Sequence, residues 1–81
     1  MPRDLLMPKL GLTMTEGLVA EWMVAEGAAF RTGDVLYLVE TEKVVNEVLA
    51  EQDGVLLRTL VPAGDTVPVG TPIAQWADAT G

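Results

Sequence analysis

Two residue types that carry much of protein chemistry are missing from this chain, which contains no cysteine and no histidine. Without cysteine it can form neither disulfide bonds nor thiolate metal sites. Without histidine it lacks the commonest general base and the commonest metal ligand. Only carboxylates remain for acid–base chemistry, and no segment predicts a pair of them held in a pocket. We therefore expect no catalytic residue and no metal site, so the chain by itself is not an enzyme.

Positive charge is also scarce, because 5 Lys and Arg residues face 12 Asp and Glu residues and the formal net charge is -7. Nucleic-acid binding draws its affinity largely from neutralised phosphates, so we expect no nucleic-acid partner. No apolar run approaches the ~20 residues of a membrane span, and we expect no membrane partner either. A basic protein is the complementary kind of partner, although an acidic surface also keeps a small domain soluble.

The length of 81 residues allows one small domain. We assign residues 1–81 to a single domain with a core at residues 5–77 and flexible or linker ends. A domain of this size buries only about 60% of the surface that its unfolded chain exposes, which leaves little room for a deep pocket.

Glycine spacing reveals an internal repeat with a constant offset of 37 residues. The matched glycines are Gly17/Gly54, Gly27/Gly64 and Gly33/Gly70, and the matched apolar residues include Leu18/Val55, Val19/Leu56 and Leu36/Ile73. Glycines mark turns that need a positive φ or a close approach of the backbone. Two similar halves in one antiparallel domain therefore indicate a quasi-two-fold axis.

Each repeat is predicted to run strand, glycine turn, short bridge, glycine turn, strand. The predicted strands are residues 5–8, 18–24, 35–40, 45–50, 55–61 and 72–76. Residues 15–29 contain fair helix formers, but Gly17 and Gly27 bracket only nine residues, and the repeat favours a strand there. Short strands with frequent turns and many β-branched residues predict a small all-β sandwich or barrel.

One lysine occupies a special place in this arrangement. Lys43 lies in the tetrapeptide Thr41-Glu42-Lys43-Val44, between two apolar stretches that read as strands. We expect it at the tip of a hairpin, at the junction of the two halves and away from the termini. A lysine there has almost no packing role, so its amine is either simply solvated, as in an unmodified assembly or adaptor domain, or a point of attachment.

Several short motifs occur in a specific order and spacing. They are Met7-Pro8-Lys9-Leu10-Gly11, Met14-Thr15-Glu16-Gly17, Trp22, Glu26-Gly27, Gly33-Asp34 and Val39-Glu40-Thr41-Glu42-Lys43. In these motifs the chain resembles the lipoyl domains of 2-oxo acid dehydrogenase acyltransferases. The resemblance covers nearly the whole chain and implies a flattened barrel of two antiparallel four-stranded sheets with quasi-two-fold symmetry, which agrees with the repeat.

The resemblance also implies that lipoate is joined by an amide bond to Lys43, which Glu40, Thr41, Glu42 and Val44 flank. The implied function is that of a carrier whose swinging arm passes acyl groups and reducing equivalents between enzymes, while the cofactor supplies the chemistry. The implied partners are a lipoate-attaching enzyme, a thiamine-diphosphate dehydrogenase, an acyltransferase core and a flavin dihydrolipoyl dehydrogenase. We expect the isolated domain to be a monomer and its parent chain to be a dihydrolipoamide acyltransferase.

The loop of residues 9–16 follows the first predicted strand, and in the family it helps the partner enzyme to recognise its own domain. Leu12, Met14 and Glu16 are our candidates for partner recognition, and the alternative for the two apolar residues is that they fold back onto the barrel. Trp22 and Trp76 are expected in the core or at its edge.

Three matters stay open at this point. Biotinyl domains share the fold, but their lysine is typically flanked by methionines, whereas Glu42 and Val44 flank Lys43 here. The segment around Lys43 somewhat resembles the acetoin dehydrogenase branch, and the pyruvate, 2-oxoglutarate and branched-chain complexes are also compatible. The chain holds no recognisable targeting segment, so we expect the cytoplasm in a bacterium and the mitochondrial matrix in a eukaryote.

Overall fold

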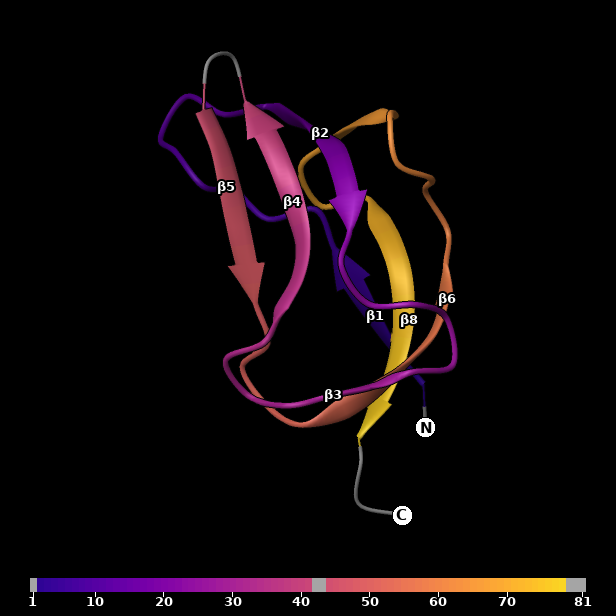
Figure 1. Cartoon of the computed structure of the whole chain (residues 1–81). Coiled ribbons are helices and arrows are strands. Elements are labelled where there is room, and N and C mark those ends of the chain that lie inside the picture. The colour runs from indigo at the N-terminus through magenta and orange to yellow at the C-terminus, as the bar shows by residue number, and fades with distance from the viewer. Residues whose placement is uncertain (1, 42–43, 79–81) are drawn as a thin grey trace.

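Eight antiparallel strands form two sheets in the computed structural model, which describes residues 2–41 and 44–78 (Figure 1). The strands are β1 (Arg3–Leu6), β2 (Glu16–Trp22), β3 (Ala29–Phe30), β4 (Val35–Thr41), β5 (Val44–Leu49), β6 (Gly54–Thr59), β7 (Thr66–Pro68) and β8 (Pro72–Asp78). One sheet has the order β1-β8-β6-β3 and the other the order β5-β4-β2-β7. The predicted all-β class with two antiparallel four-stranded sheets is confirmed. In the described part of the chain no helix is long and apolar enough to cross a membrane.

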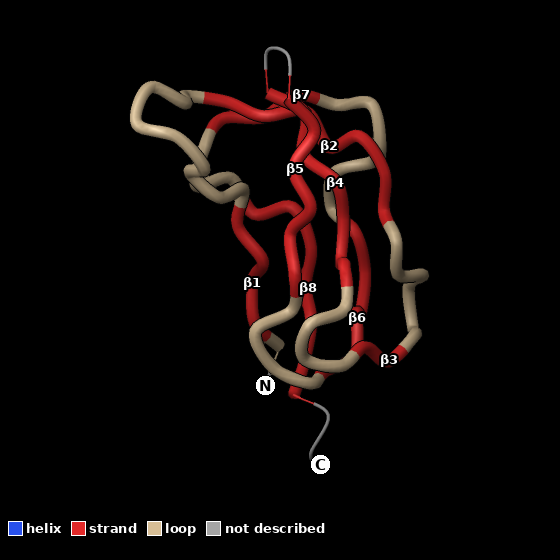
Figure 2. Tube along the Cα trace, turned by 60° about the vertical axis from the view of Figure 1, so that its left-hand side comes forward, coloured by secondary structure: helices blue, strands red, loops and turns tan. Residues whose placement is uncertain are grey.

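The two sheets face each other across one apolar core (Figures 1 and 2). The buried residues are Met7, Val19, Phe30, Leu36, Tyr37, Val39, Ala50, Leu56, Val61, Ile73 and Ala74. Alternation produces this core, because β2 buries Gly17 and Val19 while the intervening side chains stay half-buried. Trp22 and Trp76 pack against the cluster from its edge, as predicted. The Trp22 indole Nε1 donates a hydrogen bond to the Val61 carbonyl at 2.9 Å.

Strand pairing reproduces the 37-residue repeat. β2, β3 and β4 correspond to β6, β7 and β8, and the partners Val19 and Val39 in the first half become Leu56 and Trp76 in the second. The register of both pairs shifts directly after this position, after Val19 in one half and after Leu56 in the other. The quasi-two-fold relation therefore extends to the irregularities of the sheets.

Several predicted segments differ from the structure, among them the second predicted strand at residues 18–24, which is Glu16–Trp22. The bridges of the repeat were not expected to be strands, yet Ala29–Phe30 pairs with β6 and Thr66–Pro68 pairs with β2. Strands of two or three residues are too short to show an alternating pattern. The first strand was expected at residues 5–8 but is Arg3–Leu6. Met7 instead follows the end of the strand, and there its N–H donates to the Thr71 carbonyl and its carbonyl accepts from the Gly70 N–H. The first strand begins at Arg3 and the last ends at Asp78, and the expected core at residues 5–77 stays a prediction.

The molecule is elongated, with extents of 38 × 21 × 20 Å. At one end Arg3 and Asp78 form an ion pair at 3.1 Å, which joins the start of β1 to the end of β8. At the opposite end β4 stops at Thr41 and β5 starts at Val44 (Figure 1). The strand ends that flank residues 42 and 43 thus lie far from the described ends of the chain.

The two halves differ in one connection. β1 and β5 are related by a different offset, of 43 residues. Ala74 and Tyr37 are equivalent positions of the repeat, and they pair with Leu5 of β1 and Val48 of β5 respectively. The strands that follow them are related by 37 residues, so the β1–β2 connection is six residues longer than the β5–β6 connection. The extra length lies in the loop before β2, which wraps past the end of the sheet where β4 passes to β5 (Figure 2).

Candidate functional site

The predicted attachment residue lies between two strand ends that are antiparallel partners. Thr41 is paired directly with Val44, and Glu40 with Val45. Only Glu42 and Lys43 connect these strands, and both lie outside the described residues, so the position of Lys43 stays a prediction. Among the predicted flanking residues, Glu40 is exposed, Thr41 is half-buried and Val44 is 55% exposed. No described side chain therefore buries this end of the hairpin.

The base of the hairpin is firmly anchored. Val39 and Tyr37 of β4 are 0% exposed and belong to the core cluster. β4 lies between β5 and β2 in the sheet, so both of its edges are hydrogen-bonded. A group at this end would project from a rigid scaffold, which is the arrangement that precise presentation to another protein requires.

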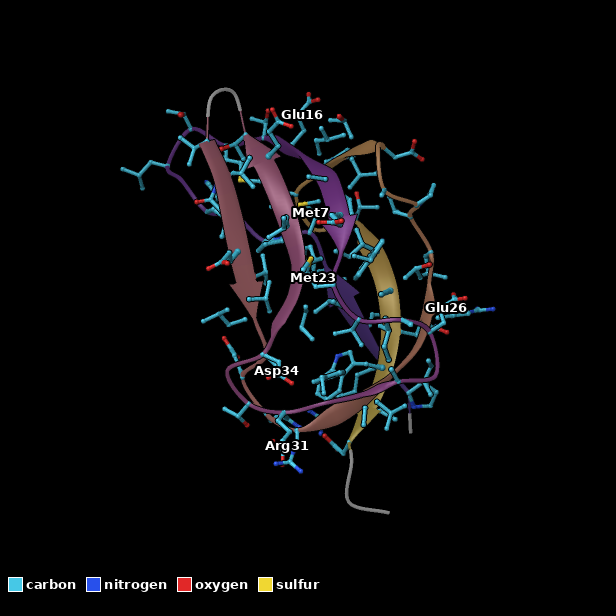
Figure 3. The ribbon with its side chains drawn as sticks, in the orientation of Figure 1. Met7, Glu16, Met23, Glu26, Arg31 and Asp34 are labelled. Carbon is cyan, nitrogen blue, oxygen red and sulfur yellow. The ribbon has the colours of Figure 1, made fainter. Side chains whose placement is uncertain are left out.

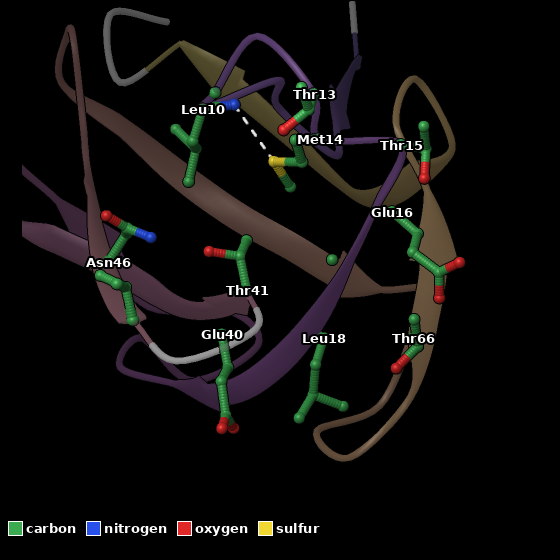
Figure 4. Close-up of a pocket in the computed structure, with 13 residues that line it drawn as sticks. Leu10, Thr13, Met14, Thr15, Glu16, Leu18, Glu40, Thr41, Asn46 and Thr66 are labelled. Atoms are coloured by element: carbon green, nitrogen blue, oxygen red, sulfur yellow. Dashed lines mark hydrogen bonds between the residues drawn. The ribbon is translucent and has the colours of Figure 1, made fainter.

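An open groove of about 730 Å³ lies beside this end of the sheet (Figure 4). One wall is the loop before β2, and the other is formed by the neighbouring ends of β4 and β5. The lining residues are Leu10, Gly11, Thr13, Met14, Thr15, Glu16, Gly17, Leu18, Glu40, Thr41, Val44, Asn46 and Thr66. The groove thus begins at Thr41 and Val44, the chain neighbours of residues 42 and 43.

Met14 holds the loop wall in place. Its Sδ atom lies 3.2 Å from the Leu10 backbone N and accepts that N–H (dashed line in Figure 4), and its own N–H donates to the Gly11 carbonyl. Its side chain packs against the core. It also fills the space above Gly17, because a Cβ atom built there would lie 2.8 Å from Met14 Cε and 2.9 Å from Met7 Sδ.

The structure separates the three residues predicted for partner recognition. Met14 folds back onto the barrel end, which was the alternative for both apolar loop residues. Leu12 does the opposite and is 96% exposed. Glu16 is exposed at the start of β2, near the same end of the molecule (Figure 3). Their role in recognition stays a prediction.

The sequence analysis did not identify the groove residues that come from the strands themselves. Leu18, Asn46 and Thr66 come from three different strands and carry no common motif. The sequence did contain a signal for the loop that forms one wall. The glycine repeat has an offset of 37 residues, whereas β1 and β5 are offset by 43, and the difference is the six extra residues of the loop before β2.

The charged side chains that line the groove within the described part of the chain are both acidic. They are Glu16 and Glu40, and in Figure 4 their carboxylates point away from Leu10 and Met14. The rest of the lining is neutral, made of small hydroxyl and amide side chains and aliphatic ones. Within the described residues no three Asp or Glu side chains are grouped so as to hold a metal ion.

Two titratable groups elsewhere are perturbed by their surroundings. Burial raises the pKa of the Tyr37 hydroxyl, which has no hydrogen-bond partner among the described residues. Hydrogen bonds from the Thr32 backbone N–H and hydroxyl lower the pKa of Asp53. Asp53 lies before β6 and Tyr37 inside the core, and neither lines the groove. The shifted pKa values of these two residues therefore bear on the stability of the fold and not on the groove.

Known proteins agree with this architecture. The sequence model of a family described as "Biotin-requiring enzyme" matches residues 3–75. The chain belongs to the biotin/lipoyl attachment family. Within it the chain is a lipoyl domain, as its similarity to a solved lipoyl domain shows. That domain, from the 2-oxoglutarate dehydrogenase complex of Azotobacter vinelandii, is 35% identical, and the match covers 93% of this chain and 95% of that one with a TM-score of 0.78.

Curated relatives are much longer proteins. The mitochondrial protein X component of the pyruvate dehydrogenase complex of Chaetomium thermophilum is 46% identical over 94% of this chain and 17% of its own length. The dihydrolipoyllysine-residue acetyltransferase component of the pyruvate dehydrogenase complex of Zymomonas mobilis is 43% identical over 90% of this chain and 17% of its own length. The lipoyl domain thus spans less than a fifth of these relatives.

Proposed function

We propose that this lipoyl domain is a carrier to which lipoate is attached through an amide bond at Lys43. The observation that supports the proposal most is the pairing of Thr41 with Val44, because it leaves Glu42 and Lys43 alone to connect two strands. The strand ends Thr41 and Val44 lie at the end of the long axis opposite the Arg3–Asp78 ion pair. In a domain tethered by its termini, a group attached between these strand ends would have the greatest reach.

The described residues fit an attached arm. Glu40 and Val44 are exposed, so nothing described competes for the space around the connection. A narrow strand end can enter the cleft of an attaching enzyme, whereas a lysine on a flat sheet face cannot. Bound lipoate supplies a dithiolane that can be reduced and acylated, and the protein contributes position and reach. Tethering keeps the carried group at an effective concentration of the order of mM.

The chain offers a matched control for the attachment site, because it has two lysines, Lys9 and Lys43. Lys9 is exposed in the loop after β1. We expect protein from a lipoate-competent host to gain one lipoyl mass, the Lys9→Arg variant to gain the same mass, and Lys43→Arg to gain none. Lipoylation of Lys43→Arg would refute the assignment. The mass of biotin instead of lipoate would favour a biotinyl carrier, and an unmodified wild type an adaptor domain.

We further propose that the parent chain is the acyltransferase of a 2-oxo acid or acetoin dehydrogenase complex. Its partners would be a thiamine-diphosphate dehydrogenase, the acyltransferase core and dihydrolipoyl dehydrogenase, in the bacterial cytoplasm or the mitochondrial matrix. The relatives belong by name to pyruvate complexes and the solved domain to a 2-oxoglutarate complex. Reductive acylation of the lipoylated domain by each thiamine enzyme, with its own 2-oxo acid or with acetoin, would identify the complex.

Recognition by the thiamine enzyme is proposed to involve the loop before β2. Leu12 and Glu16 are the exposed contacts, and Met14 acts by holding the loop in place. We expect Leu12→Ser to lower the rate of reductive acylation while leaving lipoylation unchanged, because only the first reaction depends on the loop. An equal loss of reductive acylation and lipoylation would argue against a role for the loop in reductive acylation alone.

A further inference from the structure

The groove beside the β4–β5 strand ends has a wall that the two-fold relation does not account for, although the strands of the two halves are closely equivalent. Its outer wall is the loop that is six residues longer than the corresponding β5–β6 connection. Because the second half closes its barrel without those residues, the fold itself does not require them. The extra loop therefore points to a role for the groove that it encloses.

The lining of the groove matches a neutral occupant that is mainly aliphatic. Leu10, Met14 and Leu18 supply apolar surface, and four threonines and Asn46 supply hydroxyl and amide groups. Among the described residues the lining contains no basic side chain, and the carboxylates of Glu16 and Glu40 point away from Leu10 and Met14 (Figure 4). An anion would be repelled here, and a free ammonium group would be drawn to the carboxylates and away from the apolar wall.

We propose that this groove is a docking site for the domain's own lipoyl arm, an inference that rests on attachment of lipoate to Lys43. The amide removes the lysine charge and leaves an aliphatic chain with one amide group, which suits the neutral lining. Thr41 and Val44 line the groove and also flank the connection that carries the lysine. The arm would thus start at the edge of its own docking site, with no loss of translational freedom on docking.

Docking of this kind is reversible, because the groove is open to solvent and offers no deep enclosure. The arm would alternate between the groove, where its chain contacts Leu18 and Met14, and solvent, where partner enzymes can reach it. An arm that is docked for half of the time reacts with a small reagent about twofold more slowly than a free arm.

The two-fold relation provides a matched pair of variants. Leu18 lines the groove, and its counterpart Val55, at an offset of 37 residues, is also half-buried in β6 and lies outside the groove. Leu18→Ser removes apolar lining, whereas Val55→Ser makes a similar change in the other half. The experiment first records intact mass and then measures NOEs between the lipoyl methylenes and the methyl groups of Met14 and Leu18. Reduction of the dithiolane by a water-soluble phosphine is timed in parallel.

We expect arm-to-Met14 NOEs in the wild type and in Val55→Ser, their loss in Leu18→Ser, and reduction about twofold faster in Leu18→Ser alone. The wild-type NOEs need no variant, so the proposal can be tested even if Leu18→Ser does not fold. A lipoylated wild type without these NOEs overturns the docking proposal only and leaves the groove to a partner protein's side chain. An unmodified wild type overturns the carrier function, and the docking proposal with it.

Discussion

Gly17 and Gly54 are two-fold equivalents, yet we expect alanine to affect them very differently. Both are buried and neither has a positive φ, so the effect of a Cβ atom is steric. At Gly54 a Cβ would lie 2.7 Å from the Ala77 carbonyl oxygen, 2.7 Å from Phe30 Cζ and 2.9 Å from Trp76 Cε3. A backbone atom of the neighbouring strand β8 and two packed rings cannot yield easily.

At Gly17 the atoms that a Cβ would meet all belong to side chains, which can move more easily than the backbone. A Cβ there would lie 2.8 Å from Met14 Cε, 2.9 Å from Met7 Sδ and 3.0 Å from Val39 Cγ1. Two of these atoms belong to flexible methionine side chains, which adapt to altered packing better than rings or backbone do. The Met14 side chain also holds the loop, so its displacement would move the groove wall.

These contacts give the expected magnitudes. Overpacking costs about 1–3 kcal/mol, and alanine in place of glycine returns about 0.4–1 kcal/mol by restricting the unfolded chain. We place Gly54→Ala at the upper end of the overpacking range, with a net loss of about 2 kcal/mol in the free energy of unfolding. For Gly17→Ala we expect a net loss between zero and about 1 kcal/mol. At about 4–8 °C per kcal/mol for a domain of this size, Gly54→Ala lowers Tm by roughly 8–16 °C.

Thermal and urea unfolding of the two variants, together with reductive acylation of each lipoylated protein, tests this reasoning. Gly54→Ala should lose stability but keep its acylation rate at temperatures where it is folded. Gly17→Ala should keep most of its stability and change its acylation rate, because the loop before β2 has moved. Equal destabilisation of the two variants, or a larger loss for Gly17→Ala, would refute the distinction between rigid and flexible neighbours.

Three further predictions concern the core, the lysine and pH. Tyr37→Phe should raise the free energy of unfolding by about 1 kcal/mol, since it removes a buried hydroxyl without a partner among the described residues; a loss in urea unfolding would show that the hydroxyl has a partner. Exchanging Glu42 and Lys43 should abolish lipoylation while the circular dichroism spectrum stays unchanged, and full modification of the shifted lysine would contradict the importance of its position. The pKa of Asp53 should lie below the ordinary range of aspartate because hydrogen bonds from Thr32 favour its charged form. Its contribution to the stability of the fold is therefore fully present above the pKa of the unfolded state and is lost as the pH falls through the lowered pKa of the folded state. An NMR titration that gives an ordinary pKa for Asp53 would argue against the Thr32 hydrogen bonds.

The sequence predicts the scaffold well where local patterns are long enough. The glycine repeat and the apolar stretches on both sides of Lys43 predicted β4 and β5, and the structure pairs Thr41 with Val44 as a hairpin requires. It predicted less where a strand is very short, as in β3, or where a buried residue such as Met7 lies outside the strands. The groove was out of reach because Leu18, Asn46 and Thr66 meet only in three dimensions.

The two-fold relation also explains why the paired ends of β4 and β5 lie opposite the start of β1 and the end of β8. The offset of 37 residues relates Thr41 to Asp78, and the offset of 43 residues relates Arg3 to Asn46. The axis therefore exchanges the end of the sheet where β4 passes to β5 with the end where β1 begins and β8 stops. One end holds Arg3 and Asp78, where the first strand begins and the last strand stops, and the other holds the paired residues Thr41 and Val44. In a symmetric scaffold the opposition of these two ends is thus fixed by topology, and the longer loop before β2 distinguishes the β4–β5 end by adding a groove wall to it.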